Sequence, residues 1–577
     1  MNADRARTEP DYANNRYPAT GTVDLDFQAR RSLGVGYFLV DYHPKPSQQY
    51  GPYQGPAQAN AAWAASPAAS GLLYRVYPTG SLAYDNLGVF KYSGTDVRDL
   101  YTPPGGQGVC GHCELFWELF KRWLALQMTA CLDPADCLPK PDVVFGWLPP
   151  NACEVAPFVG LADSTTKKVA LGAAGLPHDV LAHEVGHLLG LKHAKCQSSG
   201  DPFEDPAWPY MSPKIQQVGF DVGNGVAVSA FAASDLMAVG NCKVGTEWIS
   251  PYHWNKLFSA LAPSSGGQSR AVALQETYAL VSGLINADGT GRLDPLFVLS
   301  SGAELPAPEG GPYCLVFYGA SGAWLGRHCF SPDFSDPISG GTGSVAYFAY
   351  ALPLPEGAVR LALQRDEMVV AQRSASSRPP EVRFTSPAGG ETWDATHRVT
   401  WVASDPDGDT LTFALFYSHD GGGGWQPVEL GFSETSLLLA TSDLPGGEMV
   451  RLRVLASDGF RTTAADSPAF RVPAKAPMAH IAVPADGSVV AQGHALILQG
   501  HGQDLEAALP EAALSWWSGR DGLLGRGDTL IVPGLTLSPG EHTISLCAQD
   551  RDGQIGSAEI RILVGQRISL PSLLRGR

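Results

Sequence analysis

The sequence predicts a multidomain protein in which a region of mixed helices and strands precedes a series of all-β modules. Three observations support this prediction. The chain has 577 residues, which is too many for a single hydrophobic core. Before residue 262, apolar residues recur both at helical spacing and in short continuous runs. After a Pro-Ser-Ser-Gly-Gly linker at 263–267, short strand-like runs alternate with turn residues.

The first domain is expected to span residues 31–262, after a polar segment at 1–30. Residues 33–43 predict a first core strand, and residues 115–128 have apolar positions at helical spacing. Residues 142–148 predict a strand that Pro149 and Pro150 end. An edge strand is expected directly before the next helix, and it consists of Val169, Ala170, Leu171 and Gly172.

The rest of the chain is predicted to form three all-β modules at 268–373, 380–473 and 477–565, followed by a tail at 566–577. The role of the first module is not indicated by its sequence. The other two have the strand and turn pattern of β-sandwiches and resemble immunoglobulin or fibronectin-III-like modules. Ser457-Asp458-Gly459 and Asp550-Arg551-Asp552-Gly553 occur at corresponding points of these two modules, which indicates an internal duplication.

The most informative motif is HExxHxxGxxH at residues 183–193. His183 and His187 are four residues apart and therefore lie on one face of a helix. Gly190 can adopt a positive φ, so the helix can end there and His193 can return toward the same point. Three imidazoles and one open position suit a catalytic zinc ion, and Glu184 is placed to take a proton from its water. The alternative is three core histidines without a metal, which would leave costly buried polar groups in an apolar segment.

This motif resembles that of the metzincin clan of zinc endopeptidases. The resemblance implies an α+β metzincin-like catalytic domain with one catalytic Zn²⁺ and Glu184 as the general base. It also implies a Met-turn, for which Met237 in the run 234–240 is the candidate. The alternative for Met237 is a core gap-filler. In addition, the resemblance implies that the strand at 169–172 pairs with extended substrate.

Two residues depart from the better-known metzincins and indicate a bacterial-type branch. Val239 stands where some members carry a tyrosine that reaches the metal, and Ala194 follows the third histidine. The resemblance spans about residues 30–262 and is specific only from about residue 140 onward.

The chain has ten cysteines, whose pairing cannot be read from the sequence alone; if the protein is exported, disulfides are their expected use. Cys196 and Cys242 follow His193 and Met237 closely, so a disulfide between them would brace the two halves of the site. Cys314 and Cys329 flank an apparent hairpin. Cys547 is predicted to be a buried free thiol. Disulfides and a second zinc are both open for the four cysteines around the first helix, Cys110, Cys113, Cys131 and Cys137.

Composition excludes several partners. The net charge of −17 leaves no basic stripe for nucleic acid and disfavours anionic membrane surfaces. No run of about 18 apolar residues is present, so no transmembrane segment is expected. The N-terminus has no apolar core of a signal peptide. We nevertheless expect a secreted or cell-surface protein whose leader was trimmed or missed.

Acidic turns recur at 405–409 and 550–553. Calcium binding and ordinary turn chemistry both explain them, but neither run has the full spacing of a known calcium loop, so Ca²⁺ is unsupported. Trp425, Trp516 and Trp517 could form a carbohydrate-stacking face or pack in cores.

The predicted function is zinc-dependent endopeptidase activity on protein or peptide substrates. One alternative is a cell-surface adhesin or glycan-binding protein with a vestigial protease domain, which would contact matrix or glycans through its β-modules. A second alternative is a zinc hydrolase that acts on a non-peptide bond.

Overall fold

The computed structural model describes residues 28–565, with internal gaps at 48–49, 80, 100–110, 129–139, 153–159, 164–165, 176–178, 197–200, 202, 222–225, 244, 264–275, 302–307, 309, 335–341, 508 and 535. Most of the segment at 1–30, the tail at 566–577 and four cysteines lie outside the described residues; these cysteines are Cys110, Cys131, Cys137 and Cys153.

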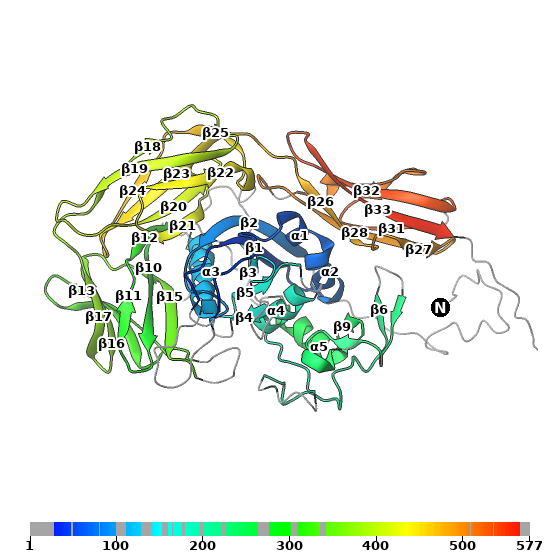
Figure 1. Ribbon diagram of the computed structural model, residues 1–577, viewed down its shortest axis with the longest axis horizontal. Coiled ribbons are helices and arrows are strands. Elements are labelled where there is room, and N and C mark those ends of the chain that lie inside the picture. The colour runs from blue at the N-terminus through cyan, green and yellow to red at the C-terminus, as the bar shows by residue number, and fades with distance from the viewer. Residues whose placement is uncertain are drawn as a thin grey trace, which may run out of the picture.

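A five-stranded sheet with the order β2-β1-β3-β5-β4 lies at the centre of the molecule (Figure 1). Its strands are β1 (Leu33–Tyr42), β2 (Leu82–Tyr92), β3 (Val143–Leu148), β4 (Gly160–Ala162) and β5 (Val169–Ala173). The first, second, third and fifth of these pair in parallel, whereas β4 pairs antiparallel with β5. β3 and β5 are buried along their whole length, as expected for a parallel sheet that is covered on both faces.

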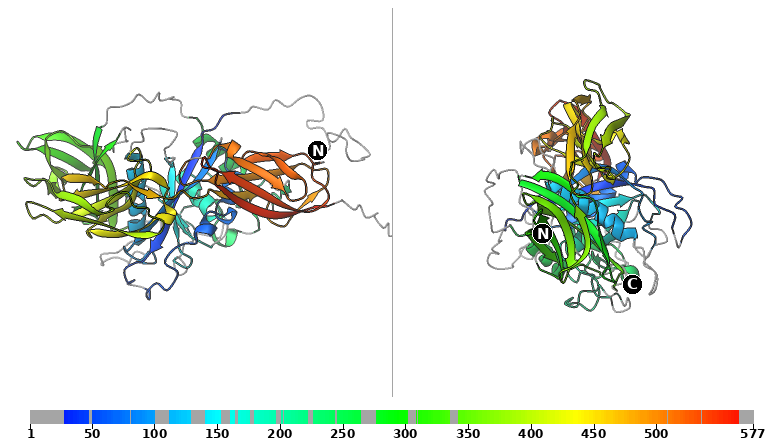
Figure 2. Two further views of the ribbon diagram at one scale, coloured as in Figure 1. Left: turned by 90° about the horizontal axis from the view of Figure 1, so that it is seen from above. Right: turned by 90° about the vertical axis from the view of Figure 1, so that its left-hand side faces the viewer.

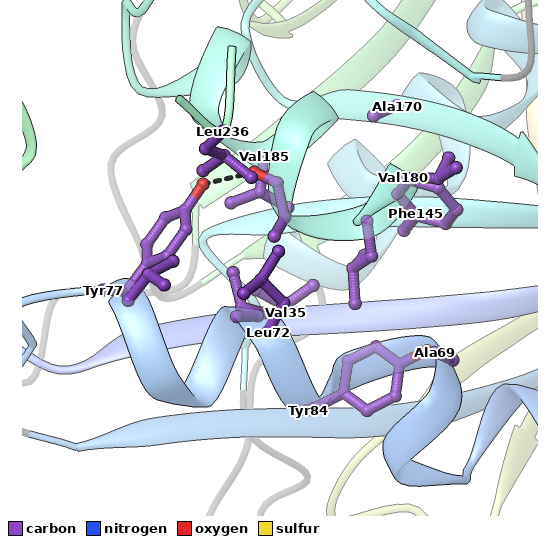
Figure 3. Packing of buried hydrophobic residues seen from close by; sticks show 14 of the residues in the cluster. Val35, Ala69, Leu72, Tyr77, Tyr84, Phe145, Ala170, Val180, Val185 and Leu236 are labelled. Atoms are coloured by element: carbon purple, nitrogen blue, oxygen red, sulfur yellow. Dashed lines mark hydrogen bonds between the residues drawn. The ribbon is translucent and has the colours of Figure 1, made fainter. Parts of the chain in front are cut away.

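Helices cover both faces of this sheet. They are α1 (Ala61–Ala64), α2 (Pro67–Val76), α3 (Gly111–Met128), α4 (Val180–Leu188) and α5 (Pro251–Ala260). Alternate residues of β1 enter two different cores, because successive side chains of a strand point to opposite faces. Val35 packs with α2 and α4, whereas Val40 packs with α3. Figure 3 shows the first of these cores, in which the Tyr77 hydroxyl donates to the Ala182 carbonyl at 2.5 Å.

The predicted edge strand is wrong in its position. Residues 169–172 belong to β5, which lies between β3 and β4 in the sheet. The edge is formed by β4, with Gly160 opposite Gly172. A three-residue strand is too short to give a recognisable alternation of apolar and polar residues, so sequence patterning passed over it.

Four short strands lie between α4 and α5 in the chain. They are β6 (Gly219–Asp221), β7 (Val226–Val228), β8 (Ser234–Asp235) and β9 (Glu247–Trp248). They form two separate two-stranded sheets, β6-β7 and β8-β9.

The chain after residue 275 consists of paired β-sheets. In residues 276–374, two four-stranded sheets contain β10 (Glu276–Asn286), β11 (Gly291–Leu293), β12 (Phe297–Ser301), β13 (Tyr313–Gly319), β14 (Trp324–Phe330), β15 (Val345–Pro353), β16 (Ala358–Arg365) and β17 (Met368–Ser374). In residues 381–472, a three-stranded and a five-stranded sheet contain β18 (Glu381–Ser386), β19 (Thr396–Ser404), β20 (Thr412–Ser418), β21 (Gln426–Phe432), β22 (Ser436–Ala440), β23 (Gly447–Ser457), β24 (Thr462–Asp466) and β25 (Phe470–Val472).

A further pair of sheets, again with three and five strands, follows in residues 478–565. It contains β26 (Met478–Val483), β27 (Ser488–Ala491), β28 (Leu496–Gln503), β29 (Leu514–Ser518), β30 (Gly522–Arg526), β31 (Thr529–Val532), β32 (Gly540–Gln549) and β33 (Ile555–Gly565). The strands at 381–472 and at 478–565 each enclose a separate hydrophobic core.

These modules flank the central sheet on two sides (Figures 1 and 2). The strands of 276–374 and 381–472 lie beside α3, and those of 478–565 lie near α2. On the first side, the guanidinium of Arg122 in α3 contacts the carboxylate of Glu429 in β21 at 2.7 Å. On the second side, the rings of Tyr74 in α2 and His501 in β28 stack with centroids 4.8 Å apart.

The predicted fold class, an α+β metzincin-like domain followed by all-β modules, is wrong as a description of this chain. Strands account for 46% of the structure and helices for 12%, so the protein is nearly all-β. The helices lie between residues 61 and 260. The physical reason is that the histidine motif specifies one helix and the turn after it, and α4 has nine residues. A local motif of that length does not set the class of a chain that is built mostly from sheets.

Candidate functional site

The three histidines of the motif converge at the end of α4. The Nε2 atoms of His183 and His187 are 3.2 Å apart, and that of His193 lies 3.3 Å from the first and 3.0 Å from the second. The first two histidines come from one face of the helix, and the third comes from the chain beyond it. Three imidazole nitrogens within this distance can hold one metal ion.

The other ring nitrogen of each histidine has a partner within the protein. His183 Nδ1 contacts the Leu236 carbonyl at 2.8 Å, and His187 Nδ1 contacts the Leu191 carbonyl at 3.0 Å. His193 Nδ1 contacts the carboxylate of Asp201. When Nδ1 donates to such an oxygen, Nε2 carries the lone pair, and this is the tautomer that binds a metal. Asp201 was missed by sequence reasoning because an acidic residue eight positions after a histidine carries no specific signal.

Burial keeps the imidazoles of His183 and His187 neutral. It lowers the pKa of His183 well below its ordinary value and that of His187 to about 3, and the neighbouring imidazoles lower both pKa values further. Neutral imidazole is the ligating form, so the electrostatics of the site favour metal binding over protonation.

Gly190 lets the chain turn back toward the helix. Its φ is +91°, and no atom lies within 4 Å of the position that a Cβ would take. The Leu191 amide then donates to the Gly186 carbonyl at 2.9 Å, which closes the end of α4. This left-handed position is the feature that brings His193 back to the other two histidines.

Met237 lies fully buried beneath α4. Its Sδ is 3.0 Å from the position that a Cβ on Gly186 would take, so the small residue in the helix makes room for it. The turn itself is held by Asp235, which accepts the Met237 amide at 2.8 Å and contacts His253 Nδ1 at 2.7 Å. Asp235 and His253 are both fully buried, and neither was identified from the sequence.

Glu184 is buried beside the three histidines. Desolvation raises the pKa of its carboxyl well above the ordinary value, and the charge of Asp179 raises it further. A Cβ on Gly160 would lie 2.8 Å from Glu184 Oε1, which places the carboxyl directly against the edge strand β4. A carboxyl with a raised pKa in such a position can accept and return a proton near neutral pH.

A disulfide joins Cys196 to Cys242, across 46 positions of the chain. It connects the segment after His193 to the segment after Met237, and the Ala194 amide also donates to the Met237 carbonyl at 2.9 Å. The two segments therefore converge as expected. Cys314 and Cys329 form a second disulfide, across the β13-β14 hairpin.

Other predicted groups are placed differently. Cys113 is disulfide-bonded, and Cys547 is a free thiol that is only partly buried. Trp516 is fully buried in its module core, whereas Trp517 is 43% exposed. Trp425 packs under the guanidinium of Arg453. The three tryptophans do not form one exposed face.

Comparison with known proteins finds similarity to β-sandwich proteins. Fibronectin(III)-like modules of CbhA from Clostridium thermocellum are 17% identical, with coverage of 32% of this chain and 95% of theirs and a TM-score of 0.15. The N-terminal four Ig domains of Dscam1 isoform 7.44 are 10% identical, with 51% and 70% coverage and a TM-score of 0.20. Titin A168169 is 12% identical, with 33% and 100% coverage and a TM-score of 0.19. No family model matches the chain, and no curated protein matches it.

The identification of the chain as a metzincin, together with the protease class that it implied, is therefore corrected. The chain is nearly all-β, with 46% of the structure in strands and 12% in helices. Among the described residues, no helix is long and apolar enough to cross a membrane. Disulfides and Ig-like modules are common in extracellular proteins. The comparisons do not bear on the three histidines and Glu184, so the function of this site follows from its geometry alone.

Proposed function

We propose that the chain is a modular binding protein that carries a zinc-dependent hydrolytic centre for peptide bonds. The observation that carries this proposal is the convergence of the Nε2 atoms of His183, His187 and His193 within 3.3 Å of one another. In the tautomer that the Nδ1 partners set, each Nε2 is a hydrogen-bond acceptor that lacks a donor. Imidazoles packed this closely therefore form no favourable hydrogen bond with one another. A cation at their centre removes that cost.

The residues fit zinc better than other common ions. Zinc favours imidazole nitrogen, and a set of three protein ligands leaves a position for water. The oxygens that contact the Nδ1 atoms provide the outer support that histidine ligands of a metal require. When bound, zinc would polarise a carbonyl and lower the pKa of a water molecule.

Glu184 would serve as the proton carrier. It follows the first ligand in the chain, and its raised pKa allows it to take a proton from water and to deliver that proton to a leaving amine. β4 would position the substrate, because among the described strands it has a neighbour on one side only, and Glu184 packs against its Gly160. An extended peptide can pair with the free edge of such a strand.

The test is digestion of casein or gelatin by the full-length chain. We expect activity that a chelator abolishes and that stoichiometric zinc restores. Glu184→Gln should lower the rate by about 10²- to 10⁴-fold while one zinc per chain is retained. Glu356→Gln, in an exposed turn of another module, is the control and should leave both activity and zinc unchanged. A Glu184→Gln variant with full activity would contradict the assigned role.

The second candidate is adhesion or glycan binding through the β-modules, with no turnover at the histidines. The paired sheets that make up residues 276–565 favour it. It predicts binding of matrix proteins or glycans that persists in Glu184→Gln and after zinc removal. The two candidates are separated by whether the chain with zinc cleaves any protein. Under either candidate, we propose that the protein is secreted or exposed at a cell surface.

A further inference from the structure

A cavity of about 290 Å³ lies where α3 meets the modules at 276–374 and 381–472. Figure 1 shows α3 beside the strands of both modules. The first module lines the cavity with residues of β10, β11, β12 and β15, and the second lines it with residues of β20 and β21. The helix contributes one face, because its lining residues are three or four positions apart: Glu114, Trp117, Glu118 and Lys121. Junctions between domains are common places for ligand sites.

Part of the cavity lining is apolar and aromatic. Leu280, Phe297 and Phe348 are buried in the first module. The half-buried rings of Trp117 and Tyr347 lie with their centroids 6.3 Å apart and their planes 32° apart. Aromatic rings that are partly open in this way can pack against the C–H face of a ligand ring that carries polar groups at its edge.

The charged groups of the lining are already paired with one another. Lys121 Nζ contacts the Glu118 carboxylate at 2.6 Å, and Arg292 contacts Asp294 at 3.3 Å. Burial acts to lower the pKa of Lys121, but the charges of Glu118 and Asp294 raise it above its ordinary value, so the ammonium stays charged. Glu114 accepts a backbone amide at 2.9 Å. An ionised ligand would therefore have to compete with contacts that the protein already makes.

Three neutral polar groups of the lining remain open to a ligand. Within the described part of the chain, nothing forms a hydrogen bond with the Trp117 indole N–H or with the hydroxyls of Tyr347 and Thr412, and none of these three groups is sealed from solvent. Burial raises the pKa of Tyr347, and the charge of Glu114 raises it further, so this hydroxyl keeps its proton and remains a donor. A ligand can bond to these groups without breaking a contact within the protein.

We propose that this cavity binds a neutral sugar residue of a glycan. A sugar hydroxyl both donates and accepts, so it can accept from Trp117 and Tyr347 and donate to carboxylate oxygens while the ion pairs stay intact. The C–H face of the sugar ring would lie against the aromatic rings. An anionic ligand would meet three carboxylates against two cations in the lining, and a zwitterionic amino acid would have to displace an existing ion pair.

This cavity would give the second candidate function, glycan binding, a defined site, and the assignment rests on that candidate. The lining shares no residue with the histidine site. A sugar bound here would contact α3 and both modules at once, so it would also hold these three parts of the molecule in one arrangement.

The test is binding of neutral oligosaccharides to the full-length chain that holds one equivalent of zinc. The probes are oligosaccharides built from glucose, galactose, mannose or N-acetylglucosamine, with free amino acids and dipeptides as charged ligands for comparison. Calorimetry with the oligosaccharide that binds best should show one site per chain. Tyr347→Phe keeps the ring and should weaken binding about 5- to 10-fold through the loss of one hydrogen bond. Trp117→Ala removes the aromatic surface and should weaken it about tenfold or more.

Two residues outside the cavity provide matched controls. Tyr350 lies on the same strand as Tyr347 but packs against Phe330, with ring centroids 5.2 Å apart, so Tyr350→Phe removes a hydroxyl elsewhere. Trp324 in β14 is 68% exposed, and Trp324→Ala removes a tryptophan that does not line the cavity. Both controls should bind the oligosaccharide as the wild type does. Circular dichroism establishes that each variant is folded, and Tyr347→Phe is the variant least able to disturb folding.

Three outcomes would overturn the proposal. They are the absence of binding by every neutral oligosaccharide, binding of only the amino acids or dipeptides with the same sensitivity to Tyr347→Phe, and unchanged oligosaccharide affinity in folded Tyr347→Phe and Trp117→Ala. The last outcome would remove this site and leave glycan binding by another part of the chain. Cleavage of casein is measured separately, so zinc-dependent hydrolysis can succeed or fail whatever the sugar titration shows.

Discussion

Two sets of neighbouring histidine rings in the described part of the chain, one at the end of α4 and one in the last module, differ in the partners of their ring nitrogens. At the end of α4, the Nε2 atoms of three histidines meet and each Nδ1 is held by an oxygen. In the last module, His480 and His501 face each other across β26 and β28 with ring centroids 5.1 Å apart. His480 Nε2 and His501 Nδ1 are buried without a partner. Burial alone therefore does not define a metal site, because convergence and outer support are also needed.

The largest expected difference between the two groups is in zinc binding. His187→Ala should lower zinc affinity by more than about 100-fold, since it removes one of three ligands. His501→Ala should leave zinc stoichiometry unchanged. The measurement is metal content after dialysis against a weak chelator. If both variants kept zinc equally well, the distinction between the two groups would be lost.

A second prediction sharpens the role of outer support. Asp201→Asn should weaken zinc binding by about 10- to 100-fold, because a neutral amide orients His193 less strongly than a carboxylate does. Asp394→Asn is a suitable control, since that carboxylate is 76% exposed. Competition with a chromophoric chelator measures the affinity. Equal affinities of the two variants would mean that Asp201 does not support the ligand.

A third prediction concerns acid stability, where the last module should respond. Burial lowers the pKa of His480 to about 4 and that of His501 to about 3. As the pH falls below 6.5, the unfolded chain therefore takes up protons before the folded chain does, and the free energy of unfolding decreases. We expect a loss of about 4 kcal/mol between pH 7 and pH 5 that is attributable to this pair, about 2 kcal/mol from each histidine.

The control for that prediction has to separate the pH dependence that His480 and His501 cause from that caused by neighbouring acidic groups. His501 stacks on Tyr74, and Asp85 and Asp528 act on Tyr74 through their charges. Burial raises the pKa of Asp85 to about 6, so the folded state takes up that proton first and acidification stabilises it. The double variant His480→Phe with His501→Phe keeps the rings and retains Asp85. Denaturant unfolding of the double variant should show less acid sensitivity than the wild type, and an unchanged pH profile would refute the assignment.

The smallest expected effect is at Met237. Met237→Leu conserves volume and should cost less than about 1.5 kcal/mol of stability while zinc is retained. The measurement is thermal unfolding with parallel metal analysis. Loss of zinc in this variant would show that the sulfur contributes more than packing.

The local features of the site could be predicted from the sequence because they depend on spacing. Two histidines four apart and the glycine at a left-handed position follow from short-range rules. The Cys196–Cys242 disulfide was expected for another reason, the convergence of the segments after His193 and Met237. Asp201, Asp235 and the Leu236 carbonyl could not be predicted, because their roles arise only when separate loops meet.

The prediction of the fold class was wrong for a related reason. The motif predicts the helix α4 in detail, but it does not determine the class of a chain in which strands predominate. The edge strand was predicted at the wrong place because β4 has only three residues, Gly160–Ala162, and none of them is polar. Long strands such as those after residue 276 were easier to anticipate, since alternation over many residues is a stronger signal than composition over three.

The disulfide between Cys196 and Cys242 makes assembly of the histidine site depend on the redox state of its surroundings. By closing a loop of 46 positions, it would contribute about 2–4 kcal/mol to the stability of the segments that hold His193 and Met237. In a reducing cytosol these segments would lack that link, and the third ligand would be held less firmly. Under the proposed function, the histidine site would therefore be weaker in a reducing compartment than in an oxidising one.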